Sequence, residues 1–98
     1  MILAIDIGNT TVALGGIQGG CVCFTARMDT VRTKTALEYR AEMDRIFAAH
    51  DQPGAPVQFE GAVLTSVVPQ ITGALVQCAR HYTGQEPVIV SPEIRTGL

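Results

Sequence analysis

The sequence predicts an α/β fold: a five-stranded mixed sheet whose elements follow the order β-β-β-α-β-α-β. An apolar run opens the chain and stops on polar residues, and a glycine-rich turn separates two further strand-like segments. Two later segments carry apolar residues at helical spacing, and each is followed by an apolar strand. Strands buried on both faces read as continuous apolar runs, whereas a helix on a core shows one apolar stripe.

Composition places the chain among globular proteins. Hydrophobic residues make up 47% of its 98 residues and charged residues 16%, which suits one small domain with its own core. The formal charge of -2 argues against a nucleic-acid-binding surface, which needs clustered basic residues. The sequence shows no signal peptide and no run near the ~20 apolar residues of a membrane span, so we expect a cytoplasmic protein without a membrane partner.

The first strand leads directly into a polar turn. Its apolar run stops on Asp6, which places a carboxylate at the strand end, where ligands of open sheets bind. A carboxylate suits hydrated Mg2+, and Gly8 permits close approach of the backbone. Asn9, Thr10 and Thr11 can donate hydrogen bonds to phosphate. An ordinary Asp-x-Gly turn is the alternative, but the strand before it and the hairpin pattern after it favour a phosphate and metal cradle.

A β-hairpin is predicted next. Residues 11–17 and 21–28 read as two strands, and the Gln-Gly-Gly turn at 18–20 suits the connection between them. Gly15 and Gly16 weaken the first of these strands, so we expect a bulge or a close backbone approach there.

The three cysteines give no sign of a metal site. No nearby His or Cys completes a zinc spacing around Cys21, Cys23 or Cys78, and Cys21 and Cys23 are too close along the chain for an easy disulfide. We expect all three to be small, reduced, buried hydrophobic residues.

A helix follows the polar connection at 29–34. Thr35 and Glu38 form a capping-box signature, with Thr35 as the N-cap. One face of the helix carries an apolar stripe that is expected to pack on the sheet. The residues of this stripe are Ala36, Tyr39, Met43, Ile46 and Phe47.

The second half of the chain predicts a strand, a helix and a short strand. After a Pro/Gly loop at 51–56, the apolar run at 61–67 indicates an interior strand. Pro69 suits the first turn of the next helix and Gly84 its end. Residues 87–90 form the fifth strand, and the chain leaves it as a loop. The buried stripe of the second helix is expected at Ile71, Leu75, Cys78 and Tyr82.

This order of elements, with Asp-x-Gly-x-Thr between the first two strands, resembles the ribonuclease H-like half-fold of actin, heat-shock ATPases and sugar kinases. The finer resemblance is to type III pantothenate kinases. It is carried by Asp6-x-Gly8-Asn9-Thr10, by Thr30, Lys34, Thr35, Glu38 and Tyr39, by Ser66-Val67-Val68-Pro69, and by Ile94-Arg95-Thr96-Gly97-Leu98.

The resemblance implies a function for the chain. Residues 1–98 would be the N-terminal nucleotide-binding lobe, incomplete without a second lobe, of a kinase that uses ATP, Mg2+ and a monovalent cation (K+ or NH4+) to phosphorylate pantothenate on the path to coenzyme A. It also implies a homodimer. Asp6 would organise Mg2+ through water, Thr96 and Gly97 would line the substrate pocket, and the catalytic base would lie after Leu98. The ATP phosphates would meet Asp6, Ile7, Gly8, Asn9, Thr10, Thr11, Val12 and Ala13.

Other interpretations remain open at this stage. A non-catalytic relative with a regulatory or accessory role would lack the Gly-x-Asp-Arg segment that the family has after Thr-Gly-Leu. His50 and His81 are expected to face solvent in the last turns of the two helices. Arg32 and Lys34 could reach toward phosphate, but a solvated loop is the favoured interpretation. The chain has no Gly-x-x-x-x-Gly-Lys-Ser/Thr sequence, which argues against a P-loop.

Overall fold

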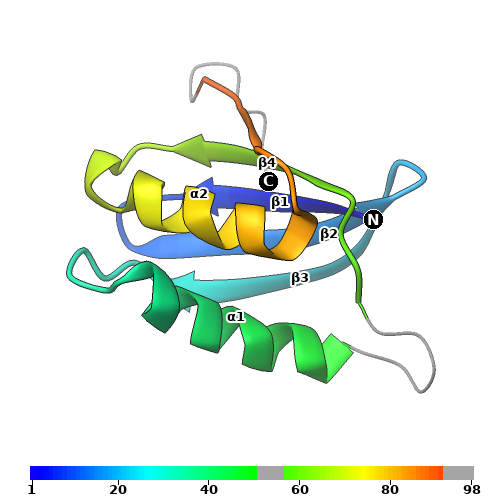
Figure 1. Cartoon of the computed structure of the whole chain (residues 1–98), viewed down its shortest axis with the longest axis horizontal. Helices are drawn as coiled ribbons and strands as arrows, with labels where there is room; N and C mark the ends of the chain where they lie inside the picture. Colours follow the sequence, from blue (N-terminus) through cyan, green and yellow to red (C-terminus); the bar gives the residue numbers. More distant parts are fainter. Residues whose placement is uncertain (51–56, 92–98) are drawn as a thin grey trace.

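The computed structural model of the chain describes residues 1–50 and 57–91. Within these residues the elements follow the predicted order (Figure 1). They are β1 (Ile2–Ile7), β2 (Thr11–Gln18), β3 (Cys21–Asp29), α1 (Ala36–His50), β4 (Gly61–Ser66), α2 (Pro69–Thr83) and β5 (Val88–Ile89). The strands form one five-stranded mixed sheet in the order β3-β2-β1-β4-β5, which confirms the predicted fold class.

Strand β1 lies at the centre of the sheet. It pairs antiparallel with β2 on one side and parallel with β4 on the other. Asp6, near its carboxyl end, lies between Ala13 of β2 and Thr65 of β4. The predicted interior position of β4 is also confirmed, because β1 and β5 flank it. The acid of the opening motif therefore lies near the end of the central strand.

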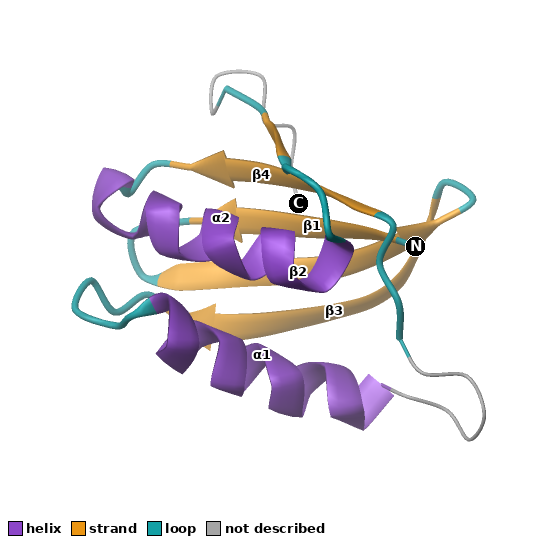
Figure 2. Cartoon of the chain, viewed as in Figure 1, coloured by secondary structure: helices purple, strands orange, loops and turns teal. Residues whose placement is uncertain are grey.

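Both helices cover the same face of the sheet (Figure 2). The strands alternate, so every second side chain of β1 points toward the helices and is buried. The core between sheet and helices includes Leu3, Ile5, Ile7, Val12, Leu14, Tyr39, Met43, Leu64, Ile71 and Leu75, each at most 3% exposed.

The hairpin has the predicted turn and bulge. Gly19 and Gly20 have φ values of 61° and 79°, a left-handed conformation that glycine adopts without strain. The register of β2 against β3 shifts between Gly16 and Ile17, because Gly16 faces Phe24 while Ile17 faces Val22. The predicted bulge therefore lies next to Gly16, and a side chain at Gly16 would overlap the Phe24 ring, so this position suits glycine.

The prediction for Cys21 and Cys23 was wrong, because both are exposed. They lie on the edge strand β3, whose buried residues are Phe24 and Met28. The register shift leaves Cys23 as the extra residue between Val22 and Phe24. Cys78 is buried as expected, and this burial raises the pKa of its thiol to about 11.

Helix α1 begins with the predicted capping box. The Glu38 amide donates to Thr35 Oγ1 at 3.2 Å, and the Thr35 amide donates to Glu38 Oε1 at 3.0 Å. Each side chain thus satisfies an amide that the first helical turn leaves without a partner. Of the predicted stripe, Tyr39, Met43 and Phe47 are buried, and Ala36 and Ile46 pack partly buried at its margin.

Helix α2 also begins and ends as predicted. Pro69 occupies its first turn, and Gly84 ends it with a φ of 72° while its amide donates to Arg80 O at 2.8 Å. Ile71, Leu75 and Cys78 of its predicted stripe are buried. Tyr82 is half-buried and donates to Arg40 O at 3.0 Å, which ties α2 to α1.

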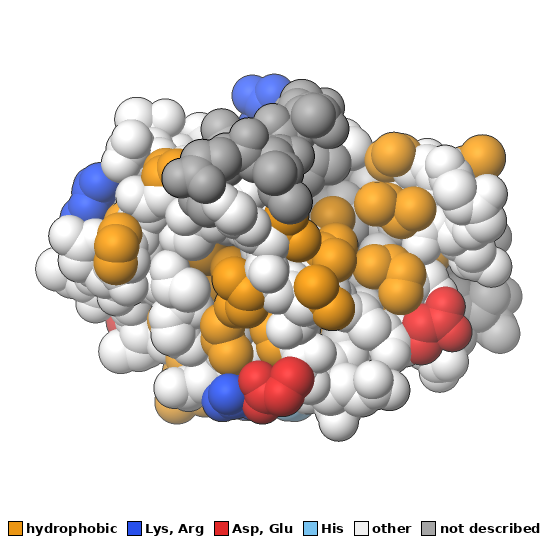
Figure 3. Space-filling model, turned by 90° about the horizontal axis from the view of Figure 1, so that it is seen from above, with side chains coloured by type: hydrophobic (Ala, Val, Ile, Leu, Met, Phe, Trp, Pro, Cys, Tyr) orange, Lys and Arg blue, Asp and Glu red, His pale blue; other side chains and the backbone are white. Residues whose placement is uncertain are grey.

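Apolar side chains also reach the surface at the β5 edge of the sheet. Val88 and Ile89 are 61% and 58% exposed. Figure 3, which views the molecule from above, shows apolar side chains gathered along the middle of that face. In the part of the chain that the structure describes, neither helix is long and apolar enough to cross a bilayer.

Candidate functional site

The turn between β1 and β2 is closed by its own backbone. The Gly8 amide donates to Thr11 O at 2.9 Å. A Cβ atom at Gly8 would lie 3.1 Å from the same oxygen, so a side chain here would crowd the turn. Close packing of the backbone therefore favours glycine at this position, although its φ is not in the left-handed region.

The turn presents its polar residues outward. Asn9 and Thr10 are exposed, and Asp6, Gly8 and Thr11 are half-buried. Asn9 and Thr10 lie between β1 and β2 along the chain, so their backbone amides are outside the ladder that pairs the two strands. Polar side chains and backbone amides beside a carboxylate form a surface that suits an anion with a hydrated cation.

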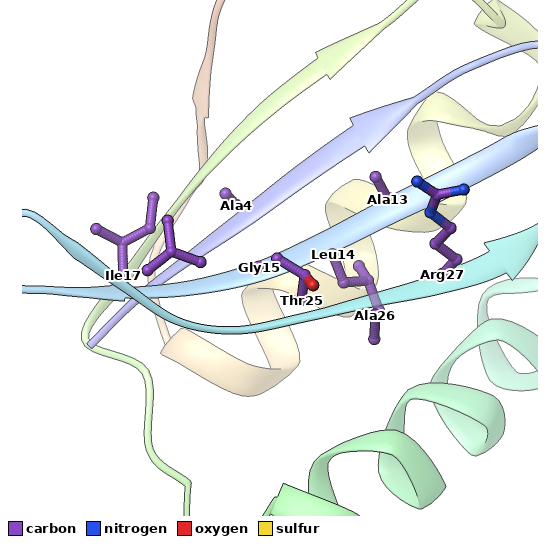
Figure 4. Close-up of a pocket in the computed structure, with 9 residues that line it drawn as sticks. Ala4, Ala13, Leu14, Gly15, Ile17, Thr25, Ala26 and Arg27 are labelled. Carbon is purple, nitrogen blue, oxygen red and sulfur yellow. The ribbon is translucent and has the colours of Figure 1, made fainter. Parts of the chain in front are cut away.

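The other three residues of the predicted phosphate site, Ile7, Val12 and Ala13, place their side chains in the core or at a cavity. The side chains of Ile7 and Val12 are 0% exposed in the core, so only their backbone borders the turn. Ala13 lines a cavity of about 270 Å³ on the sheet face opposite the helices (Figure 4). Strands β1, β2 and β3 contribute small residues to this cavity, among them Ala4, Gly15 and Thr25, and Arg27 of β3 also lines it.

The carboxylate of Asp6 is held from the neighbouring strand. Thr65 Oγ1 donates a hydrogen bond to Asp6 Oδ1 at 2.7 Å. The two residues are direct partners in the parallel register of β1 and β4. Thr65 was not identified from the sequence, and the available signal was a hydroxyl within the apolar run of the fourth strand, just before Ser-Val-Val-Pro.

The loop after β3 packs against the turn. Thr30 Oγ1 donates to Gly8 O at 2.7 Å, and the Thr30 amide donates to Thr10 O at 3.0 Å. Arg32 donates to Asn9 Oδ1 at 3.3 Å. Arg32 is exposed on a loop as expected, but it also brings a permanent positive charge to the turn. Lys34 instead pairs with Glu42 at 2.8 Å, and this hydrogen bond raises the pKa of Lys34.

Tyr39 of α1 anchors the loop that follows β3. Its ring is 0% exposed, which confirms the predicted core packing. Its hydroxyl donates to Val31 O at 2.7 Å and accepts from the Val31 amide at 2.9 Å. The loop residue between Thr30 and Arg32 is therefore anchored through both of its backbone groups.

We expect Tyr39→Phe to loosen this loop. The substitution keeps the buried ring but leaves the Val31 amide and carbonyl without the hydroxyl, at a cost of about 1–3 kcal/mol. Hydrogen exchange should show faster exchange at Val31, and urea unfolding should show reduced stability. An unchanged exchange rate at Val31 would contradict the anchoring role of the hydroxyl.

The end of β4 is fixed beside the same turn. The Val67 amide donates to Ile7 O at 3.0 Å, which extends the pairing of β4 and β1 beyond the strands. Ser66 Oγ accepts from the Val68 amide at 3.0 Å and from Thr72 Oγ1 at 2.9 Å. The Ser-Val-Val-Pro segment thus connects the strand end to the start of α2.

The other candidate residues have structural contacts. His50 is exposed but stacks on Phe24, with 4.5 Å between ring centroids, and His81 contacts the edge of Tyr82. Glu38 is the helix cap. Thr96 and Gly97 of the predicted substrate pocket lie outside the described residues.

The donor set fits a hydrated metal ion better than a protein cage. Within residues 1–50 and 57–91, no group of three or more His, Cys, Asp or Glu side chains gathers at one point. A single carboxylate beside the backbone amides of a turn suits Mg2+, which keeps several waters and takes few protein ligands. Asp6, held by Thr65, is the residue that would meet it.

Comparison with known proteins gives one consistent family. The family described as type III pantothenate kinase matches residues 2–98. The type III pantothenate kinases of Exiguobacterium sp. and Moorella thermoacetica are 39% and 36% identical over 98 residues. Each match covers 100% of this chain and 38% of the relative, so the chain spans well under half the length of these proteins.

A solved structure supports the fold. Lmo2764 from Listeria monocytogenes, assigned as an N-acetylmannosamine kinase, superimposes with a TM-score of 0.53 at 21% identity. The match covers 92% of this chain and 34% of that protein. At this identity the likeness concerns the fold alone, and it agrees with the ribonuclease H-like half-fold expected from the order of elements.

Proposed function

The chain belongs to the type III pantothenate kinase family, and we propose that it forms the N-terminal lobe of an enzyme that phosphorylates pantothenate. The reaction transfers the γ-phosphoryl group of ATP to the 4'-hydroxyl of pantothenate, which yields 4'-phosphopantothenate and ADP on the path to coenzyme A. The relatives that support this assignment match the chain over its whole length.

The observation that carries the proposal is the closed turn beside Asp6. For phosphoryl transfer a protein mainly positions groups and stabilises charge. The Gly8 to Thr11 turn would hold the phosphates through amides and hydroxyls, and the Arg32 guanidinium beside Asn9 adds positive charge there. When bound at Asp6, Mg2+ would supply charge neutralisation for the transferred group.

Further properties come from the family resemblance. We propose that the enzyme requires Mg2+ and a monovalent cation (K+ or NH4+), acts as a homodimer, and works in the cytoplasm. Thr96 and Gly97 would line the pantothenate pocket, and the base that accepts the hydroxyl proton would come from a segment beyond Leu98.

The activity is tested with the full-length protein and, in parallel, with residues 1–98 alone. We expect the full-length protein to form 4'-phosphopantothenate from pantothenate with ATP, Mg2+ and K+, measured by coupled detection of ADP and by mass spectrometry of the product. Omission of pantothenate controls for simple ATP hydrolysis. No product from the folded full-length protein would contradict the proposed function.

The 98-residue chain alone should form no product under the same conditions. The described residues near the turn offer groups that would bind phosphate. The base that accepts the proton of the substrate hydroxyl is proposed to lie beyond Leu98. Turnover by the pure chain would place the base within residues 1–98, contrary to this proposal.

A further inference from the structure

Among the residues that the structure describes, Thr65 is a polar residue whose side chain is buried. It is 8% exposed, at the next-to-last position of β4. The sheet ladder uses only backbone groups, and its neighbours on the same face of the strand are Gly61 and Val63. Packing at position 65 therefore calls for no hydroxyl, since valine has nearly the same shape as threonine.

The hydroxyl of Thr65 has a specific partner. It donates to Asp6 Oδ1 at 2.7 Å, a distance typical of a hydroxyl bound to a carboxylate. The hydroxyl proton is thus directed at Asp6, the carboxylate beside the turn between β1 and β2. The terminal torsion of an Asp side chain is broad, so a hydrogen bond from the neighbouring strand restricts the orientation of the carboxylate.

We propose that Thr65 is a positioning residue for the Asp6 carboxylate. Its hydroxyl sets the plane of the carboxylate before any ligand arrives, so that the acid meets the hydrated metal and the ATP phosphates without reorganisation. The inference rests on the proposed function of the turn and names a residue on β4 that acts on the chemistry through β1. A carboxylate accepts several hydrogen bonds at once, so a bond from Thr65 leaves capacity for water bound to a metal.

Two substitutions separate positioning from packing. Thr65→Val removes the hydroxyl and keeps the shape, whereas Thr65→Ser keeps the hydroxyl and removes the buried methyl group. Thr25→Val, at an exposed site on β3, makes the same chemical change away from Asp6. Loss of a group that orients a metal-binding residue typically weakens binding or activity by about 10–100-fold.

The experiment uses the full-length protein and compares ligand affinity, kinetics and thermal stability among the variants. Calorimetric titration with MgATP gives the affinity, and steady-state kinetics gives the dependence of kcat on Mg2+. We expect Thr65→Val to weaken MgATP binding by about 10–100-fold, with thermal unfolding near that of the wild type. Thr65→Ser should bind close to the wild type although it unfolds at a lower temperature, and Thr25→Val should bind normally.

The outcomes distinguish this proposal from the proposed function. Wild-type MgATP affinity in Thr65→Val, or equal losses in Val and Ser, would overturn positioning and leave the kinase assignment intact. If the wild type binds MgATP but does not phosphorylate pantothenate, the assignment fails, while weaker binding by Thr65→Val still supports positioning. A crystal structure of metal-free Thr65→Val should show the Asp6 carboxylate turned from its wild-type orientation.

Discussion

Asp6→Asn should reduce the turnover of the full-length enzyme by about 10²–10³ while the protein stays folded. The amide has nearly the shape of the carboxylate, and its oxygen can still accept the hydrogen bond from Thr65. The negative charge that would meet the hydrated metal is lost. Steady-state kinetics with pantothenate and ATP measures the loss, and circular dichroism checks the fold.

Asp29→Asn is the matched control for this substitution. It removes the same charge from the last residue of β3, which pairs with Thr11 at the edge of the turn. If the effect came only from the net charge near the turn, both variants should lose similar activity. We expect the control to keep turnover near the wild-type value, and a folded Asp6→Asn enzyme with near-normal turnover would contradict the role of Asp6.

Phe47→Ala should be the most destabilising of the substitutions considered, by about 3–5 kcal/mol. Phe47 is 6% exposed and joins separate parts of the fold. Its ring centroid lies 6.0 Å from that of Phe24 on β3, 4.9 Å from that of Phe59 before β4, and 4.9 Å from that of Tyr82 on α2. Truncation leaves a cavity at the point where these elements meet.

Urea unfolding followed by circular dichroism measures this effect, with Leu37→Ala as the control. Leu37 lies on the same helix but is 65% exposed, so its truncation should change the free energy of unfolding by no more than about 0.5 kcal/mol. Equal losses in the two variants would show that α1 is stabilised by its own propensity and not by the aromatic contacts.

Local signals explain why most of the fold was predictable from sequence. The capping box at Thr35 and Glu38 and the glycine turn at 19–20 act over a few residues, so the residue types alone specify them. The bulge next to Gly16 was predicted from the glycines at 15 and 16, because glycine within a strand often marks a bulge or a close approach.

Burial on the edge strand was not predictable in the same way. Alternation along β3 indicates two faces but does not say which of them a helix covers. Cys21 and Cys23 were assigned to the core because free cysteine is usually buried, but the buried residues of β3 are Phe24 and Met28, and both cysteines are exposed.

The candidate site was predictable only in its local part. Gly8, Asn9 and Thr10 follow one another in the chain, and the motif identifies them directly. Thr65 is 59 residues from Asp6, and Thr30 is 22 residues from Gly8. These contacts depend on the register of β4 against β1 and on the path of the loop after β3, neither of which a local pattern specifies.

We propose that residues 8–11 hold the phosphates of ATP beside Asp6. Nuclear magnetic resonance of the nitrogen-15-labelled full-length protein, titrated with MgATP, tests it most directly. The amide signals of Gly8, Asn9 and Thr10 should show the largest shifts, and these shifts should be much weaker in Asp6→Asn. Shifts centred elsewhere on the protein, with the signals of these three amides unmoved, would contradict the account.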